Sequence, residues 1–369
     1  MNRDTQIIHA GYRRTRDAGP FLPGPQFSST YTTPGDPTQH ALTYGRFGNP
    51  TWSAWEEALA LLEGGESIAF ASGMAATSAV FGVTLKPGDT VVLPAESYYT
   101  TRLLGTQWLA TLGITVRMAP TRDNAQGALL EGARLLWIES PSNPHLDVCD
   151  IAQLARAAKA AGALVAVDNT TATAYLQLPL ALGADYVVAA DTKALTGHSD
   201  LVLGHVATTS AERAAALRTW RTQHGAIPGP MEVWLAHRSL ATLPLRLTRQ
   251  CEGAMRLATH LAKHRAVTRV HYPGLVDHPG HTIAAQQMRA FGGVVSFDLA
   301  TRERAEKFLG SLSLVREATS FGGVHSTAER RARWGADAIS EGFIRFSVGC
   351  EDPDDILADV EGALRGVAA

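Results

Sequence analysis

The sequence contains little cysteine and no long apolar run. Its three cysteines, Cys149, Cys251 and Cys350, lie far apart among 369 residues, and this number and spacing fit neither a disulfide framework nor a set of metal ligands. No stretch approaches the roughly 20 apolar residues of a membrane-spanning helix, and no apolar run follows the first residues as in a secretory signal. We therefore expect a soluble cytoplasmic protein with no metal site and no membrane partner.

Positive charge is also limited, and lysine in particular is scarce. The formal net charge is −2 and no basic face accumulates, so nucleic acid is not an expected partner. Only five of the 33 basic residues are lysines, which makes the search for a catalytic lysine short. These five are Lys86, Lys159, Lys193, Lys263 and Lys307.

The length and the residue pattern predict an arm followed by two domains. Residues 1–55 are rich in Gly, Pro, Ser, Thr and Tyr and predict an extended arm that does not pack. In residues 56–230, short apolar strands alternate with helices, which predicts an α/β domain with a doubly wound, mostly parallel sheet. Residues 231–369 predict long helices, broken near residues 243–245 by Pro244, and then a smaller α+β domain.

The individual elements follow from the same pattern. In the large domain we expect strands at 67–71, 90–93, 135–138, 163–167, 186–189 and 203–208. Helices are expected at 54–62, 74–85 and 151–161. In the C-terminal domain we expect strands at 294–298 and 343–348 and a last helix at 353–364.

Two turns after predicted strands could bind parts of a charged ligand, because ligands of such sheets bind beyond the carboxyl ends of the strands. Gly73 and Met74 open a helix, where small residues and free N–H groups favour a phosphate, although a strand-to-helix turn needs a small residue in any case. Asp168 ends an apolar strand, where a buried acid needs a partner such as a pyridinium nitrogen. A helix cap or a structural salt bridge would also explain it.

Two basic residues also occupy unusual places. Lys193 follows a buried strand, where a lysine could be desolvated and nucleophilic, whereas the other lysines have easy surface explanations. Arg345 lies inside a short apolar strand and needs an anion to face, such as a carboxylate. Buried ion pairs within the protein would explain both residues as well.

Together these four features meet the needs of one cofactor. A phosphate turn, a strand-end acid, a candidate lysine and a carboxylate-binding arginine suit pyridoxal phosphate with an amino-acid substrate. No GxGxxG, GxSxG or HExxH motif supports a dinucleotide, a hydrolase nucleophile or zinc.

Motifs along nearly the whole chain support this interpretation. The sequence resembles the Cys/Met-metabolism family of pyridoxal-phosphate enzymes, which includes cystathionine γ-lyase, cystathionine γ-synthase, methionine γ-lyase and homoserine-ester sulfhydrylases. The motifs are YGRFGNPT at 44–51, ASGMAA at 71–76, ESPSNP at 139–144, VDNT at 167–170, TKALTGHSD at 192–200, YPGL at 272–275 and RFSVGCED at 345–352. The resemblance implies the fold-type I architecture and a homotetramer built from two dimers that share active sites.

The resemblance also implies a role for each matched residue. Lys193 would hold the cofactor covalently and then move protons, and Tyr99 would stack on its ring and assist the reaction. The other cofactor contacts would be Gly73, Met74 and Thr192 at the phosphate, Tyr44 and Arg46 at the phosphate of the neighbouring subunit, Asp168 at the ring nitrogen and Asn143 at the ring hydroxyl. Arg345 would bind the substrate α-carboxylate, with Ser320 near Lys193.

Several positions depart from the family pattern. Ala190 replaces a phosphate-binding serine, and Ala194 replaces a tyrosine after the lysine. Thr43 and Thr319 stand where members that handle cystathionine often carry acids, which are expected to meet its distal amino group. Thr100-Thr101 replaces Gly-Gly, and residues 327–337 replace the usual segment at the substrate entrance.

The sequence therefore predicts a C–S lyase that acts at the γ-carbon, closest to cystathionine γ-lyase. The alternative is γ-replacement on an activated homoserine, as in cystathionine γ-synthase, a homoserine-ester sulfhydrylase or a specialised-metabolism enzyme. A third possibility is a degenerate member that binds the cofactor without catalysis. The presence of Lys193, Tyr99, Asp168 and Arg345 counts against it, because a degenerate site should have lost some of them.

Overall fold

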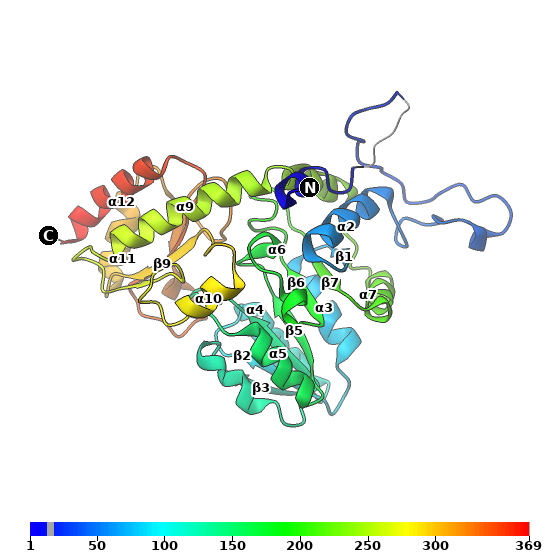
Figure 1. Cartoon of the computed structure of the whole chain (residues 1–369), viewed down its shortest axis with the longest axis horizontal. Coiled ribbons are helices and arrows are strands. Elements are labelled where there is room, and N and C mark those ends of the chain that lie inside the picture. The colour runs from blue at the N-terminus through cyan, green and yellow to red at the C-terminus, as the bar shows by residue number, and fades with distance from the viewer. Residues whose placement is uncertain (13–17, 369) are drawn as a thin grey trace.

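The large domain of the protein is built on one twisted sheet. The computed structural model describes residues 1–12 and 18–368 (Figure 1). Within them, this sheet has the strand order β1-β7-β6-β5-β4-β2-β3. Its strands are β1 (Glu66–Phe70), β2 (Thr90–Pro94), β3 (Thr115–Ala119), β4 (Leu135–Glu139), β5 (Leu164–Asp168), β6 (Tyr186–Ala189) and β7 (Gly204–Thr208). Pairing is parallel except that β7 runs antiparallel to both neighbours.

Helices cover both faces of this sheet. Because side chains alternate along a strand, Val91 of β2 packs under α3 (Gly73–Thr84) and α7 (Ala211–His224), whereas Val92 packs under α5 (Ile151–Ala160) on the opposite face. A third core lies around α2 (Pro50–Glu63), α6 (Thr173–Leu176) and α8 (Pro230–Leu240). The α/β class and the mostly parallel sheet expected from the sequence are thereby confirmed.

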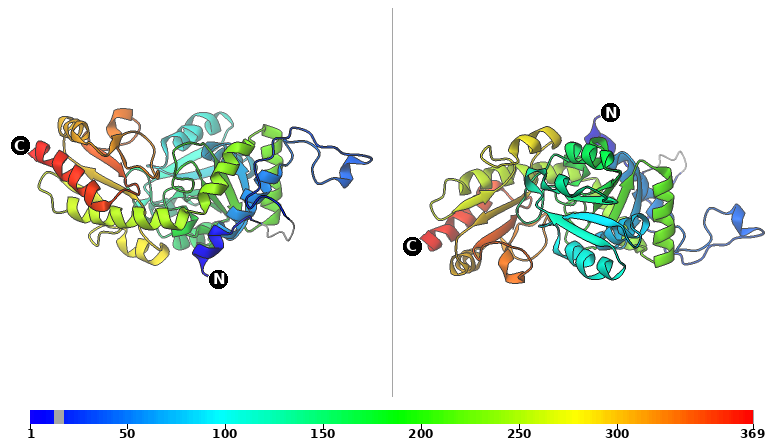
Figure 2. Two further views of the ribbon diagram at one scale, coloured as in Figure 1. Left: turned by 90° about the horizontal axis from the view of Figure 1, so that it is seen from above. Right: turned by 90° about the horizontal axis from the view of Figure 1, so that it is seen from below.

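The C-terminal domain has its own sheet and core. The sheet order is β10-β11-β12-β9-β8, with β8 (Arg269–His271), β9 (Val294–Asp298), β10 (Arg316–Glu317), β11 (Thr327–Arg330) and β12 (Phe343–Ser347). Figure 2 shows helices along this sheet. They include α9 (Leu243–Leu261), α11 (Arg302–Ser311) and α12 (Pro353–Ala368), and α10 (His281–Gln287) lies nearer the large domain. The core contains Tyr272, Phe297, Phe308 and Phe346.

Helix α9 belongs to both lobes. Leu243 and Leu247, near its start, pack into the core around α2, whereas Leu257 and Leu261, near its end, pack into the C-terminal core. The predicted break in the helical stretch is confirmed, although it lies at residues 241–242, just before Pro244. The preceding helix α8 ends at Leu240, and Pro244 lies in the first turn of α9, where its missing N–H costs no helical hydrogen bond.

The N-terminal segment is only partly the extended arm that the composition predicted. Residues Arg3–Ile8 form a short helix, α1, with Ile7 buried, because Arg3 donates hydrogen bonds to Leu62 O (3.0 Å) and Ala174 O (2.6 Å). The predicted arm also covers residues 13–17, which lie outside the described residues. From residue 18 to Asn49 the chain forms a long loop that projects from the body (Figure 1), and α2 begins at Pro50, before the predicted boundary at 55.

Several elements had no clear sequence signal. Strand β3 carries Arg117 and is largely exposed, and β8, β10 and β11 are only two to four residues long. Helix α4 (Tyr99–Leu103) is also short. Within residues 1–12 and 18–368, no helix combines the length and apolar character needed to cross a membrane.

Candidate active site

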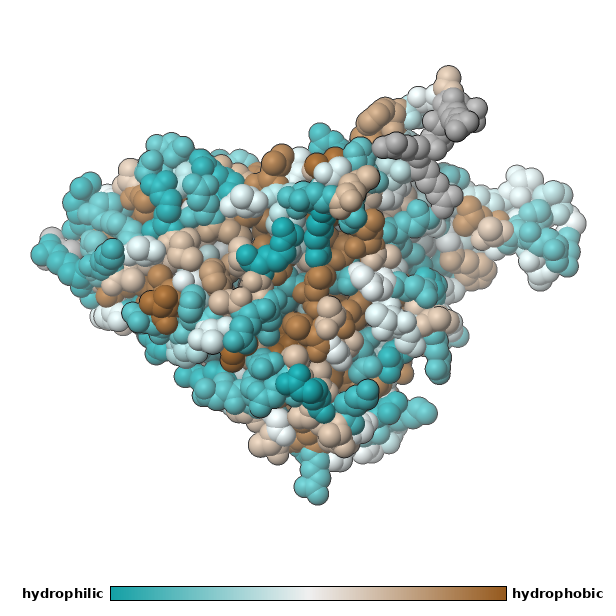
Figure 3. Space-filling model, in the orientation of Figure 1, coloured by the Kyte–Doolittle hydropathy of each residue, from teal (hydrophilic) through white to brown (hydrophobic). Residues whose placement is uncertain are grey.

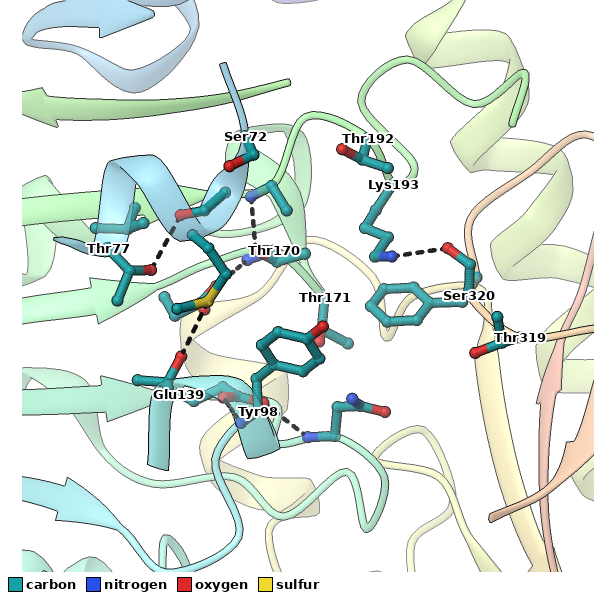
Figure 4. Close-up of a pocket in the computed structure, with 18 of the residues that line it drawn as sticks. Ser72, Thr77, Tyr98, Glu139, Thr170, Thr171, Thr192, Lys193, Thr319 and Ser320 are labelled. Carbon is teal, nitrogen blue, oxygen red and sulfur yellow. Dashed lines mark hydrogen bonds between the residues drawn. The ribbon is translucent and has the colours of Figure 1, made fainter. Parts of the chain in front are cut away.

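A cavity of about 320 Å³ lies between the two domains. It opens at the carboxyl ends of β4, β5 and β6, where Glu139, Asp168 and Ala190 lie, and β12 contributes Arg345 from the other side. Figure 4 shows its walls, with the amine of Lys193 and the hydroxyl of Ser320 meeting on one side. The other lining residues that matter below are Ser72, Gly73, Met74, Tyr98, Thr101, Asn143, Thr170, Thr192, Thr319, Phe321 and Arg331.

The predicted phosphate turn forms one end of the cavity. Helix α3 begins at Gly73, and its N-cap Ser72 accepts a hydrogen bond from Ala75 N (3.1 Å). A Cβ atom at Gly73 would lie 2.6 Å from the Cβ of Ala190, so only glycine allows this close approach. The start of α3 therefore faces the cavity with free N–H groups and the positive end of the helix dipole, which suits an anion.

The Thr192 hydroxyl is already engaged behind this turn. It donates to Leu203 O (3.1 Å) and accepts from Leu203 N (3.0 Å). These bonds fix the loop that carries Lys193 to the end of the sheet. Thr192 lines the cavity as expected, with its hydroxyl held by the backbone.

A buried triad that sequence reasoning missed supports the same loop from behind. His205 Nδ1 lies 2.6 Å from Asp191 Oδ1, and its Nε2 lies 3.0 Å from Glu63 Oε1. Although burial opposes protonation, Asp191 and Glu63 raise the pKa of His205 to about 10. The loop between Ala190 and Lys193 is thus tied by an ion pair to β7 and to the end of α2.

Lys193 lies in the cavity as predicted. Its Nζ donates a 2.7 Å hydrogen bond to Ser320 Oγ and lies 5.3 Å from the centre of the Phe321 ring. Burial, and then the positive charge of Arg345, lower the pKa of Lys193 to about 8. At pH 7 about one-tenth of such an amine is unprotonated, far more than for an ordinary lysine, and this fraction can act as a nucleophile and a base.

Arg345 is almost fully buried and has partners within the protein. Its Nη1 donates to Asn143 Oδ1 (2.7 Å), and its Nη2 donates to Ser320 O (3.0 Å) and to Glu329. Burial lowers the pKa of Arg345 to about 10, still well above neutral. The sequence allowed an ion pair within the protein as an alternative explanation for Arg345, and such a pair does form with Glu329. Arg345 nevertheless lines the cavity, as Asn143 does.

Asp168 and Glu139 end neighbouring parallel strands in the same register. Burial raises the pKa of Asp168, which accepts a hydrogen bond from Thr170 N (3.0 Å). Burial, and then the charge of Asp168, raise the pKa of Glu139. The expected strand-end acid is present, and a second acid lies beside it.

The aromatic residue at the cavity is Tyr98, whereas the sequence prediction named Tyr99. Tyr98 lines the cavity and Tyr99 does not, and the two rings meet edge to face at 5.8 Å. The structure fixes Tyr98 because its backbone N–H donates to Glu139 Oε2 (2.7 Å) (Figure 4). Tyr99 is the first residue of α4 and is exposed. Two adjacent tyrosines give no sequence signal that distinguishes them.

Tyr44 and Arg46 are not brought to the cavity of their own chain. Both lie in the projecting loop, where Arg46 Nη1 donates to Thr222 O (3.0 Å) and its guanidinium lies over the Tyr44 ring. Tyr44 is 45% exposed. Any contact of these residues with a cofactor must therefore involve another chain.

The unusual entrance segment forms a charged network next to Arg345. Arg331 lines the cavity and donates to Glu329 Oε1 (3.1 Å) and Asp337 Oδ2 (2.7 Å). Asp337 also pairs with Arg102 of α4 (2.8 Å). Sequence reasoning did not assign Glu329 or Arg331 to the site, because their roles depend on contacts between β11, β12 and α4.

Comparison with known proteins identifies this arrangement. The model of the Cys/Met metabolism PLP-dependent enzyme family matches residues 4–365. The chain belongs to this family. It is therefore a pyridoxal-phosphate-dependent enzyme, as the sequence predicted.

Relatives with different activities are similar to this member over their whole length. A Streptomyces coelicolor protein provisionally named cystathionine gamma-lyase is 55% identical over 365 residues, which are 98% of this chain and 93% of that protein. A cystathionine beta-lyase of Lactococcus lactis subsp. cremoris is 39% identical, with 98% of each chain covered. The structure of cystathionine gamma synthase from Xanthomonas oryzae pv. oryzae in complex with cystathionine superposes with a TM-score of 0.96 at 35% identity, covering 100% of this chain and 99% of that one.

The cavity fits the cofactor of the family. The close approach at Gly73, the partly buried Asp168 and the desolvated amine of Lys193 surround one space that is large enough for a small aromatic phosphate. They match its phosphate, its ring nitrogen and its aldehyde, respectively. Ala190 leaves one hydroxyl donor fewer than the family pattern has.

Proposed function

We propose that this enzyme cleaves the bond between the γ-carbon and sulfur of an L-amino acid, most similarly to cystathionine γ-lyase. The observation that carries the proposal is the position of Lys193. Its amine, with a pKa lowered to about 8, shares one cavity with the buried guanidinium of Arg345. An amino acid whose carboxylate binds Arg345 would present its α- and β-carbons to Lys193.

Different residues of the cavity would bind different parts of the cofactor. When bound, pyridoxal phosphate supplies an aldehyde that captures the substrate amine and a ring that withdraws electrons from the α-carbon. Gly73 and Met74 would donate N–H groups to its phosphate, with Thr192 close by. Asp168 would face the ring nitrogen and Asn143 the ring hydroxyl.

Two residues would act on the reacting part of the substrate. Lys193 would remove the α-proton and then a β-proton, and Ser320 would hold its amine between these steps through their 2.7 Å hydrogen bond. Tyr98, in place of Tyr99, would cover the ring and assist departure of the thiol. Hydrolysis would leave 2-oxobutanoate and ammonia.

We further propose that the active sites are shared within a homotetramer. Tyr44 and Arg46 lie far from the cavity of their own chain, on a loop that also exposes Phe21, Phe27 and Phe47. Figure 3 shows apolar residues on this projecting segment. A neighbouring subunit would bury them and receive Tyr44 and Arg46 at its phosphate site. The cytoplasmic location remains a prediction from the sequence.

The second candidate is γ-replacement on an activated homoserine. The observation that favours it is Thr319, which lines the cavity and points its hydroxyl toward Glu329 (3.4 Å). Neither Thr319 nor Thr43 offers a charge to the distal amino group of cystathionine, and Arg331 lines the same cavity. A substrate with a neutral distal group suits such walls better.

One set of assays separates the two candidates. The purified enzyme with its cofactor would be given cystathionine, homocysteine and methionine, and 2-oxobutanoate, pyruvate and free thiol would be measured. In parallel, O-acetylhomoserine would be supplied with and without cysteine. Formation of 2-oxobutanoate and thiol supports elimination, whereas thioether formation that requires cysteine supports replacement. Lys193→Ala is the control for background reactions.

A further inference from the structure

Glu139 lines the cavity and has no role in the reaction proposed above. It is the last residue of β4 and is only 4% exposed. Its two oxygens accept hydrogen bonds from different backbone groups. Oε2 accepts from Tyr98 N (2.7 Å), and Oε1 accepts from Asn143 N (3.0 Å). One carboxylate thus holds Tyr98 and Asn143, which are 45 residues apart in the sequence.

The two segments held by Glu139 carry two different walls of the site. Tyr98 presents its ring to the cavity. Asn143 accepts a 2.7 Å hydrogen bond from Arg345. The position of Glu139 therefore determines where the aromatic cover and the partner of Arg345 lie relative to each other.

A second carboxylate, that of Asp168, lies beside Glu139, and in the part of the chain that the structure describes the one cation that acts on it from within the cavity is Lys193. Asp168 is paired with Glu139 in the register of the parallel strands. Among the described residues, neither carboxylate has a basic nitrogen within 4.0 Å. Two neighbouring buried carboxylates oppose each other's ionisation. A cation placed against Asp168 removes that opposition.

We infer that Glu139 is a positioning residue that couples occupation of the Asp168 site to the placement of Tyr98 and Asn143. The inference rests on the proposed function in that the cation is the protonated ring nitrogen of the cofactor. When the carboxylate of Glu139 is ionised, it can accept hydrogen bonds from the N–H groups of both Tyr98 and Asn143. When it is protonated, one of its oxygens carries a hydrogen that faces an N–H group, so only one good acceptor is left. Binding of the ring nitrogen at Asp168 therefore keeps Glu139 ionised, and the ionised Glu139 fixes the segments of Tyr98 and Asn143.

The test uses Glu139→Gln in the full-length enzyme, with Glu96→Gln as the matched control. Glu96 also accepts a backbone hydrogen bond, from Thr121 N (2.6 Å), but it does not line the cavity. Each protein would be stripped of cofactor and titrated with pyridoxal phosphate, with affinity and the visible circular dichroism of the bound form as readouts. We expect Glu139→Gln to bind about ten-fold more weakly (~1.4 kcal/mol), with a reduced dichroism band, and Glu96→Gln to match the wild type.

A second pair of variants tests the coupling itself. If Glu139 acts through Tyr98, the double variant Glu139→Gln/Tyr98→Ala should bind pyridoxal phosphate no more weakly than the weaker-binding of the two single variants. The reason is that the interaction shared by the two residues is lost only once. Fully additive losses would overturn the inference, as would wild-type affinity in Glu139→Gln or an equal loss in Glu96→Gln. Should Glu139→Gln not fold, Glu139→Asp keeps the charge with a shorter reach, and the same loss is expected.

These readouts do not depend on the substrate. An enzyme that failed every substrate assay would still report whether Glu139 controls the affinity and the geometry of the bound cofactor. Conversely, normal turnover of cystathionine with unchanged cofactor binding in Glu139→Gln would contradict only the inference about Glu139.

Discussion

The amine of Lys193 and the hydroxyl of Ser320 are 2.7 Å apart although they belong to different domains. Ser320 adopts a backbone φ of +76°, which is uncommon for a residue other than glycine. In this conformation its hydroxyl meets Lys193 while its carbonyl accepts from Arg345 (3.0 Å). The C-terminal domain thus places a single residue against both the reactive amine and the carboxylate-binding guanidinium.

Lys193→Ala should abolish turnover and the visible absorption of bound cofactor. No other lysine lines the cavity among the described residues, so no second amine can form the covalent bond. Borohydride reduction followed by mass spectrometry would check this. A cofactor still attached to the variant after reduction would show that the lysine has been misassigned.

In protein stripped of cofactor, Lys193 should be acetylated faster than the exposed Lys86 at pH 8. The pKa of Lys193 is lowered to about 8, mainly by burial, so roughly half of its amine is free at that pH. The measurement is peptide mapping after brief treatment with a small reagent such as acetic anhydride. Equal or slower modification of Lys193, at reagent levels that leave the fold intact, would contradict the lowered pKa.

Mixing inactive Arg46→Ala chains with inactive Lys193→Ala chains should restore partial activity. Arg46 does not reach the cavity of its own chain, where it bonds Thr222 O. If it serves a neighbour, a mixed dimer contains one site in which both residues are intact. Subunit exchange would be verified with differently tagged chains. Exchange without any recovery would assign Arg46 to its own subunit.

Thr319→Glu should raise kcat/KM for cystathionine relative to O-acetylhomoserine by about ten-fold. A charge-assisted contact with the distal amino group contributes roughly 1–2 kcal/mol more than a neutral hydroxyl does. Thr319→Gln, which has a similar shape without the charge, is the control and should leave the ratio near that of the wild type. An unchanged ratio in Thr319→Glu would mean that the distal amino group is recognised elsewhere, first of all by Glu329 or Asp337 of the segment 327–337.

His205→Gln should destabilise the protein most at neutral and lower pH. Asp191 and Glu63 raise the pKa of His205 to about 10 in the folded state, above about 6.5 for an unfolded histidine. A raised pKa contributes stability that is full below pH 6.5 and is lost as the pH rises through 10. We expect a difference in unfolding free energy of roughly 4 kcal/mol at pH 6, shrinking toward pH 10.

Denaturant unfolding at several pH values would measure this difference. His224→Gln, on the exposed end of α7, is the control. A difference between the wild type and His205→Gln that does not vary with pH would mean that His205 is not held as a cation in the folded protein.

Local sequence signals located much of the fold and of the site. Apart from the more exposed edge strand β3, which was missed, the strands of the large sheet are apolar and bounded by Gly, Pro or Asp, so their positions were predicted to within one or two residues. Lys193, Asp168 and Arg345 were found because each is a charged residue at the end of, or within, an apolar strand, where its burial needs a reason.

The remaining site residues depend on contacts that no local pattern contains. Tyr98 and Tyr99 are equally exposed, at 42% and 41%, but only Tyr98 lines the cavity, and its backbone N–H is held by Glu139 of another strand. Glu329 looks like an ordinary charged residue of a polar segment until β11 pairs with β12 and places it opposite Arg345. Similarly, α1 was missed because its anchor, Arg3, bonds to carbonyl groups of distant segments.

Helix α9 connects the two lobes and is packed into both. Its first turns are anchored in one hydrophobic core and its last turns in the other, and the cavity with Lys193 on one wall and Arg345 on the other lies between them. A continuous helix resists bending. A motion that widens this cavity therefore has to tilt α9 as a whole relative to one of the two cores. The width of the active site is therefore coupled to how α9 packs in the two cores.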